Sequence, residues 1–183
     1  IRWLAGQALS RLVTTSSDVT PIYDKILDLL VHETEDISWS AGLAAMHELL
    51  RLEPPFAVDL LKEYASIKRK NNHLIVNLLD YIWHMPDLKE NILTEWSADT
   101  NIHVRQCLID ALDSYPLAGA YPHFRQLAKT KYANIRAKVA EILGKIYNLE
   151  LNAEILIVLH KLQRDKSKTV QQTAQATLKS IKL

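Results

Sequence analysis

Three carboxylates recur at nearly equal spacing in the middle of the chain. They are Asp80, Asp110 and Glu141, separated by 30 and 31 residues. Carboxylates that lie close together can act as a general acid and base, or can share a divalent cation. Both chemistries require the side chains to converge, so the elements that carry them decide between a reactive site and a charged surface.

Each of these carboxylates lies within an apolar pattern that has the period of an α-helix. From Val104 onwards, apolar or small residues recur at offsets 0, 3, 4, 7 and 8. This spacing predicts a helix that buries one face and exposes the other. The same template fits at Ile135, Val170 and Ile1, and more weakly at Trp39 and Leu74. At Ile1 it places Leu4 and Leu12 on the buried face.

The six template positions define a repeat. They begin at residues 1, 39, 74, 104, 135 and 170, so successive copies are 30 to 38 residues apart. Prolines and polar turns between them mark the starts of a second set of helices. The sequence therefore predicts an all-α fold of about eleven helices, arranged as antiparallel pairs in a single repeat domain over residues 1–183. Because the first copy is the second helix of a pair, we expect the chain to be a fragment of a longer protein.

The residues around the second helices resemble those of HEAT repeats. Asp99 lies five residues before Val104, and Asp165 lies five residues before Val170. The dipeptide Val-Arg or Ile-Arg begins three of the copies, at residues 1, 104 and 135. The resemblance implies a right-handed α-solenoid whose second helices line a concave side. It also implies an Asp–Arg ladder between successive repeats, to which Asp99, Arg105, Arg136 and Asp165 would belong. For Arg105 and Arg136 this structural role is preferred over partner binding.

The predicted packing decides what the three carboxylates can do. Neighbouring packed helices lie about 8–10 Å apart, which is too far for the carboxylates to share one metal ion. We therefore expect no metal site and no catalytic residue there. Two interpretations stay open: a solvated helix face, or an acidic stripe on the concave side that binds a basic or amphipathic partner segment. Trp83, at a partly exposed offset, would be a further contact.

The net charge of +1 hides an uneven distribution. Residues 1–99 hold 9 Lys and Arg against 15 Asp and Glu, whereas residues 100–183 hold 13 against 6. We use the term basic edge for the cations at the turns between paired helices: Lys68, Arg69, Lys70, Lys129, Lys131, Arg164, Lys166 and Lys168. The edge is either a set of solvated turns or an anion-binding surface for nucleic-acid phosphates, an acidic protein tail or a membrane surface.

A second, shorter resemblance concerns nucleic acid. The stretch from Glu95 to Arg105 is similar to a segment of the DNA alkylation repeat glycosylases, which excise damaged bases with an Asp flanked by aromatic residues. Asp80 and Trp83 share one predicted helix, but LIVNLLDYIW lacks the surrounding aromatic residues. Non-catalytic nucleic-acid binding through the basic second half is therefore kept as the alternative function, and we expect no enzyme activity.

The remaining residues offer little further chemistry. The seven His residues never have metal-ligand spacing with a Cys or a carboxylate, and no Gly-rich phosphate loop is present, so we expect no cofactor. The single Cys107 lies on an apolar stripe, which predicts a buried thiol and a reducing, cytoplasmic compartment. No apolar run approaches the roughly 18 residues of a membrane span. The predicted function is a protein-binding scaffold or a regulatory module.

Overall fold

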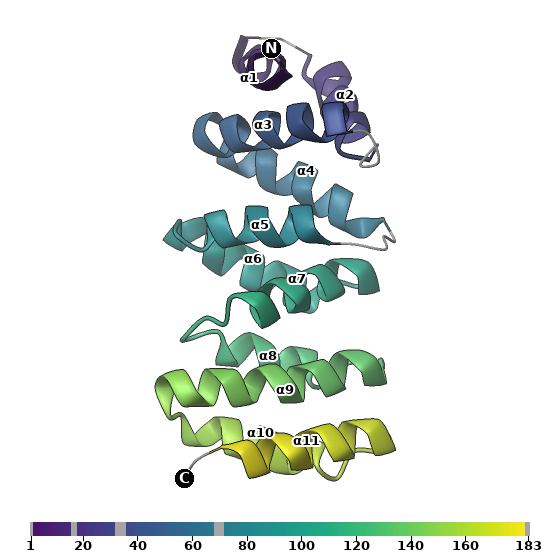
Figure 1. Cartoon of the computed structure of the whole chain (residues 1–183), viewed down its shortest axis with the longest axis vertical. Helices are drawn as coiled ribbons and strands as arrows, with labels where there is room; N and C mark the ends of the chain where they lie inside the picture. Colours follow the sequence, from purple (N-terminus) through teal and green to yellow (C-terminus); the bar gives the residue numbers. More distant parts are fainter. Residues whose placement is uncertain (1, 16–17, 32–35, 68–71, 182–183) are drawn as a thin grey trace. The chain divides into compact units, whose positions relative to one another are not determined.

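The structure is a computed structural model, and it describes residues 2–15, 18–31, 36–67 and 72–181. Within these ranges the chain forms eleven α-helices and no strand (Figure 1). The all-α class and the number of helices predicted from the sequence are therefore confirmed. The right-handed α-solenoid and the single domain over residues 1–183 stay predictions.

The chain divides into two compact units, Ile1–Leu78 and Leu79–Leu183, with the division inside the fifth helix. The helices of the first unit are α1 (Arg2–Thr15), α2 (Thr20–Val31), α3 (Asp36–Leu52), α4 (Pro54–Ser66) and the first part of α5 (His73–Ile82). Those of the second are the end of α5, α6 (Pro86–Ala98), α7 (Ile102–Ser114), α8 (Tyr121–Leu127), α9 (Ala133–Glu150), α10 (Ala153–Leu162) and α11 (Lys168–Ser180).

Local sequence accounts for where these helices begin. Pro54 and Pro86 each occupy the first position of their helix, where the missing N–H is not needed. The side chain of Asn101 accepts a hydrogen bond from the backbone N–H of His103, and Asn152 caps α10 in the same way. Ser167 precedes α11 in the same way, but its side chain forms no capping hydrogen bond.

The first unit is built around α3, which contacts α1, α2 and α4. Helix α1 lies close against α3 at Gly6, where a Cβ atom would be 2.3 Å from the carbonyl oxygen of Ala41. The predicted burial of Leu4 and Leu12 is wrong, because they are 66% and 50% exposed. The face of α1 that packs is the one with its smallest side chain, and the larger leucines are turned away from it.

The second unit is built around α9, which contacts α7, α8, α10 and α11. In Figure 1, α9 and α11 lie side by side. Leu108 of α7 and Val139 of α9 are fully buried, as the template predicts. Cys107 is also buried, which confirms the expectation for the single thiol.

One buried ion pair joins α9 to the turn before α11. The Nε and Nη2 atoms of Arg136 donate to the two carboxylate oxygens of Asp165 at 2.7 and 2.8 Å, and Nη1 donates to the carbonyl oxygen of Thr130 at 2.8 Å. The side chains are only 5% and 12% exposed. The hydrogen bond from Arg136 lowers the pKa of Asp165. The geometry therefore compensates both buried charges within the protein.

We expect Leu151→Gly to raise the melting temperature of the protein. Leu151 ends α9 in the left-handed conformation, with φ of 47° and ψ of 36°, and it is 70% exposed. The left-handed conformation costs a side-chain-bearing residue about 1 kcal/mol, and an exposed leucine loses little packing when it is removed. The control is Leu149→Gly inside the same helix, which should instead lower the stability by about 1 kcal/mol. Thermal unfolding followed by circular dichroism measures both changes.

We expect Asp165→Asn to lower the free energy of unfolding by about 3 kcal/mol at neutral pH, because Arg136 keeps its buried charge but loses its carboxylate. The folded-state pKa of Asp165 lies below its unfolded value of about 3.9, so its contribution is complete above that pH and is lost as the pH falls through the folded pKa. The stability difference between wild type and variant should therefore shrink below about pH 4.

Chemical denaturation at a series of pH values measures this difference. The control is Glu141→Gln, which removes an exposed ion pair with Lys138 and should change stability by less than about 1 kcal/mol. A constant difference between wild type and Asp165→Asn down to pH values well below the unfolded pKa would contradict the assigned role of the pair.

Candidate functional site

The predicted acidic stripe contains cations as well as carboxylates. Glu141 forms an ion pair with Lys138 at 3.0 Å, and the Nζ atom of Lys138 lies 2.7 Å from a carboxylate oxygen of Asp113. Lys145 also contacts Asp113, at 2.5 Å. Burial alone would raise the pKa of Asp113, but the hydrogen bonds from the two lysines outweigh it and lower the pKa. On the α7–α9 part of this surface, Asp113 and Glu141 are therefore already paired with lysines.

Asp80 and Asp110 are half-buried, and Asp110 accepts a hydrogen bond from the side-chain amide of Gln106 at 2.8 Å. Trp83 departs from the prediction: it is only 6% exposed, so it packs in the core instead of forming a surface contact. Trp83 directly follows α5, which ends at Ile82, and its backbone N–H still donates to the carbonyl oxygen of Leu79 at 2.9 Å. The helical course therefore continues to Trp83, and its side chain is covered by tertiary packing that the helical offset does not take into account.

The described cations of the predicted basic edge do not lie on one surface. Lys68, Arg69 and Lys70 lie outside the described residues. Lys166 and Lys168 are exposed near the start of α11 and line neither of the two grooves described below. The other three cations of the edge, Lys129, Lys131 and Arg164, line these grooves.

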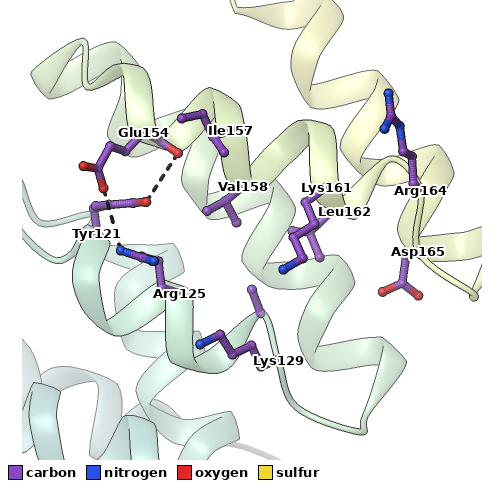
Figure 2. Close-up of a pocket in the computed structure, with 11 residues that line it drawn as sticks. Tyr121, Arg125, Lys129, Glu154, Ile157, Val158, Lys161, Leu162, Arg164 and Asp165 are labelled. Carbon is purple, nitrogen blue, oxygen red and sulfur yellow. Dashed lines mark hydrogen bonds and ion pairs between the residues drawn. The ribbon is translucent and has the colours of Figure 1, made fainter.

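The larger groove lies between α8 and α10, and we call it the α8–α10 groove (Figure 2). Its volume is about 540 Å³. Two contacts join its walls at one end: the hydroxyl of Tyr121 donates to the carbonyl oxygen of Glu154 at 3.3 Å, and Arg125 lies 3.9 Å from the Glu154 carboxylate. It is lined by Tyr121, Arg125, Ala128, Lys129, Glu154, Ile157, Val158, Lys161, Leu162, Arg164 and Asp165.

Both apolar side chains and cations line this groove. Ile157 is 68% exposed, although it is a large apolar residue in the middle of a helix. Figure 2 shows it beside Val158, with Lys161 one helical turn further along α10. Among the described residues, no carboxylate forms an ion pair with Lys129, Lys161 or Arg164, whereas both lining carboxylates have a basic partner. The groove therefore combines exposed apolar surface with uncompensated positive charge.

The groove also contains four residues that were not predicted from the sequence: Arg125, Ile157, Val158 and Lys161. A signal for two of them is present in the sequence, because Ile155–Leu159 is a run of five apolar residues. A helix that buries only one face needs fewer consecutive apolar residues than this. Within the run, only the two end residues, Ile155 and Leu159, are fully buried. The surplus apolar residues between them indicate a surface that can be covered by a partner.

A smaller groove lies where α6, α7 and the turn before α9 meet, and we call it the Arg105 pocket. Its volume is about 430 Å³. The Nη1 atom of Arg105 donates to the hydroxyl oxygen of Thr130 at 3.0 Å. Lys129 lines both this pocket and the α8–α10 groove, so the two adjoin at that residue. The lining residues are Ser97, Thr100, Arg105, Gln126, Lys129, Thr130, Lys131 and Tyr132.

No group of three or more His, Cys, Asp and Glu side chains in the described part of the chain is arranged to hold a metal ion. No helix among the described residues is long and apolar enough to cross a membrane.

Comparisons with protein-family models, with curated proteins and with solved structures find no match to this chain. The resemblance to HEAT repeats therefore stays a prediction, and the function must be argued from the two grooves.

Proposed function

We propose that this chain is a non-catalytic protein-binding module built from HEAT-like repeats, arranged as a right-handed α-solenoid. Its second unit binds an acidic, amphipathic segment of another protein in the α8–α10 groove. The observation that carries the proposal is Ile157, a 68% exposed apolar side chain beside cations that lack a carboxylate partner among the described residues. Contiguous exposed apolar surface flanked by charge is typical of a protein-interaction site.

The chemistry of the groove favours one kind of segment. Apolar side chains of the segment would cover Ile157 and Val158, which recovers the hydrophobic free energy that these residues do not gain within the unit. Acidic side chains would lie against Lys129 and Lys161 on either side. An amphipathic helix with acidic residues beside its apolar stripe meets both requirements, because one face of it presents apolar and acidic side chains together.

The charge distribution favours this site over the acidic stripe as the principal surface. The carboxylates Asp113 and Glu141 already have lysine partners on α9. A basic segment binding there would have to displace existing ion pairs, whereas an acidic segment in the groove meets cations with no such pair. Complementary charge also raises the rate of association and favours acidic over basic partners.

We expect a library of random displayed peptides, selected on the whole chain, to yield acidic peptides with apolar residues at helical spacing. Ile157→Ser should weaken their binding about tenfold, because the central apolar contact is lost. Lys161→Glu should have an effect of similar size through charge repulsion. Fluorescence anisotropy with the labelled peptides measures the dissociation constants.

Two matched variants serve as controls. Leu149→Ser replaces another exposed apolar residue and Lys168→Glu reverses another exposed cation, and neither residue lines the groove. Both should bind the selected peptides as the wild type does. Selection of basic peptides, or equal losses in the controls, would show that the segment binds elsewhere.

Nucleic-acid binding is the second candidate, favoured by the excess of 13 Lys and Arg over 6 Asp and Glu in residues 100–183. The apolar surface of Ile157 and Val158 argues against it as the main role of the α8–α10 groove, because a phosphate backbone does not cover such surface.

We expect a short labelled DNA duplex to bind only weakly, and the affinity to vanish as the salt concentration approaches about 0.15 M. Anisotropy across a salt series tests this, with single-stranded RNA of the same length as a second probe. Micromolar binding that persists at this salt concentration would make nucleic acid the partner instead.

A further inference from the structure

The repeat register shows that one inter-repeat ion pair is incomplete. The residues five positions before the template starts at 104, 135 and 170 are Asp99, Thr130 and Asp165. At two successive copies, the residue one position after the template start is an arginine, Arg105 and then Arg136. Each arginine reaches the next copy, but one meets a carboxylate and the other meets a hydroxyl.

The pair Arg136–Asp165 shows what a complete contact provides. Its guanidinium makes two short hydrogen bonds to the carboxylate, and a third goes to the carbonyl oxygen of Thr130. Both charges are buried and compensated, which is the condition under which a buried ion pair is tolerated.

Arg105 occupies the equivalent position without that compensation. Its Nη1 donates to the Thr130 hydroxyl at 3.0 Å, and its Nη2 reaches the carbonyl oxygen of Ala98 only at 3.5 Å. Its Nε is buried and has no hydrogen-bond partner among the described residues. Buried N–H groups of a charged side chain rarely lack an acceptor, because leaving one unsatisfied is costly. A neutral hydroxyl thus stands where the following copy supplies a negative charge.

The composition of the Arg105 pocket identifies the ligand that would complete this contact. Its eight lining residues include three cations, Arg105, Lys129 and Lys131, and no Asp or Glu. The others supply hydroxyl groups and one amide. Arginine and lysine with hydroxyl donors are the groups that bind phosphate oxygens in proteins. The volume of about 430 Å³ is ample for a phosphate group.

We propose that the Arg105 pocket binds the phosphate of a phosphorylated serine or threonine in the partner segment. Lys129 lines both the pocket and the α8–α10 groove, so a segment that follows the groove past Lys129 brings a side chain to the pocket. Three cations match the nearly doubly charged phosphomonoester better than the singly charged diester of a nucleic acid. Only the carrier of the phosphate rests on the proposed function; the pocket itself is independent of it.

The pocket is tested first with inorganic phosphate alone. Phosphate, but not sodium chloride at the same ionic strength, should raise the melting temperature of the wild-type chain, and calorimetry should give a single site. Thr130→Asp supplies a carboxylate to Arg105 from within the protein. This variant should melt at a higher temperature than wild type without phosphate and should no longer respond to phosphate.

Two lysine variants separate the pocket from the groove. Lys131→Gln alters only the Arg105 pocket and should weaken phosphate binding several-fold, while the affinity for an unphosphorylated acidic peptide stays at the wild-type value. Lys161→Gln alters only the groove and should have the opposite pattern. No response of the wild type to phosphate beyond that to chloride would overturn the pocket, and so would an unchanged response in Thr130→Asp.

The carrier is tested with the peptides selected on the α8–α10 groove, each phosphorylated at one serine or threonine at a time. One position should raise the affinity for wild type about tenfold and should not do so for Thr130→Asp. The phosphopeptide assignment is wrong if no phosphorylated position raises the affinity in this way while single-stranded RNA competes with phosphate for the Arg105 pocket. If the unphosphorylated peptides do not bind but phosphate does, the proposed function fails and the pocket stands.

Discussion

The burial of one apolar face per helix is the constraint on which the rest of this structure depends. No single amphipathic helix can cover its own apolar face, so each must pack against its neighbours. In the second unit α9 contacts α7, α8, α10 and α11, and its inward residues, such as Val139 and Leu143, are fully buried. A partner can meet only what this packing leaves uncovered, and in the second unit this includes the outward side of α10 and turns that join the helices.

The same packing determines which charges need a partner. When α9 and the turn before α11 come together, Arg136 is buried and requires Asp165. One copy earlier the backbone follows the same course, but Thr130 replaces the carboxylate and Arg105 keeps its net charge. On the α7–α9 surface, by contrast, Lys138 and Lys145 compensate Asp113 locally. The second unit thus has compensated charges on its α7–α9 surface and uncompensated cations in its two grooves. Both grooves therefore favour negatively charged groups.

Much of the fold could be predicted from local patterns, and the exceptions have local causes. The period of the apolar residues located six of the eleven helices, and prolines and polar turns marked the others. The buried thiol followed from the position of Cys107 on an apolar stripe. Trp83 was misplaced because a helical offset takes no account of what packs against the end of a helix, and this side chain is only 6% exposed. Leu4 and Leu12 were misplaced because α1 lies against α3 at Gly6 and buries Val13, whereas the two leucines stay exposed. Arg125 and Lys161 carried no signal, because exposed cations on helices are common whether or not they line a groove.

The sequence by itself determined the helices, their repeat and the inventory of charges, because helical periodicity, caps and prolines act over a few residues. Only the tertiary structure decided which charges meet. Arg136 reaches Asp165 across 29 residues and Arg105 reaches Thr130 across 25, so these contacts depend on how successive helix pairs pack. The α8–α10 groove likewise forms only when α8 and α10, which are more than 20 residues apart in the sequence, both pack along the same side of α9. No local sequence pattern specifies that arrangement.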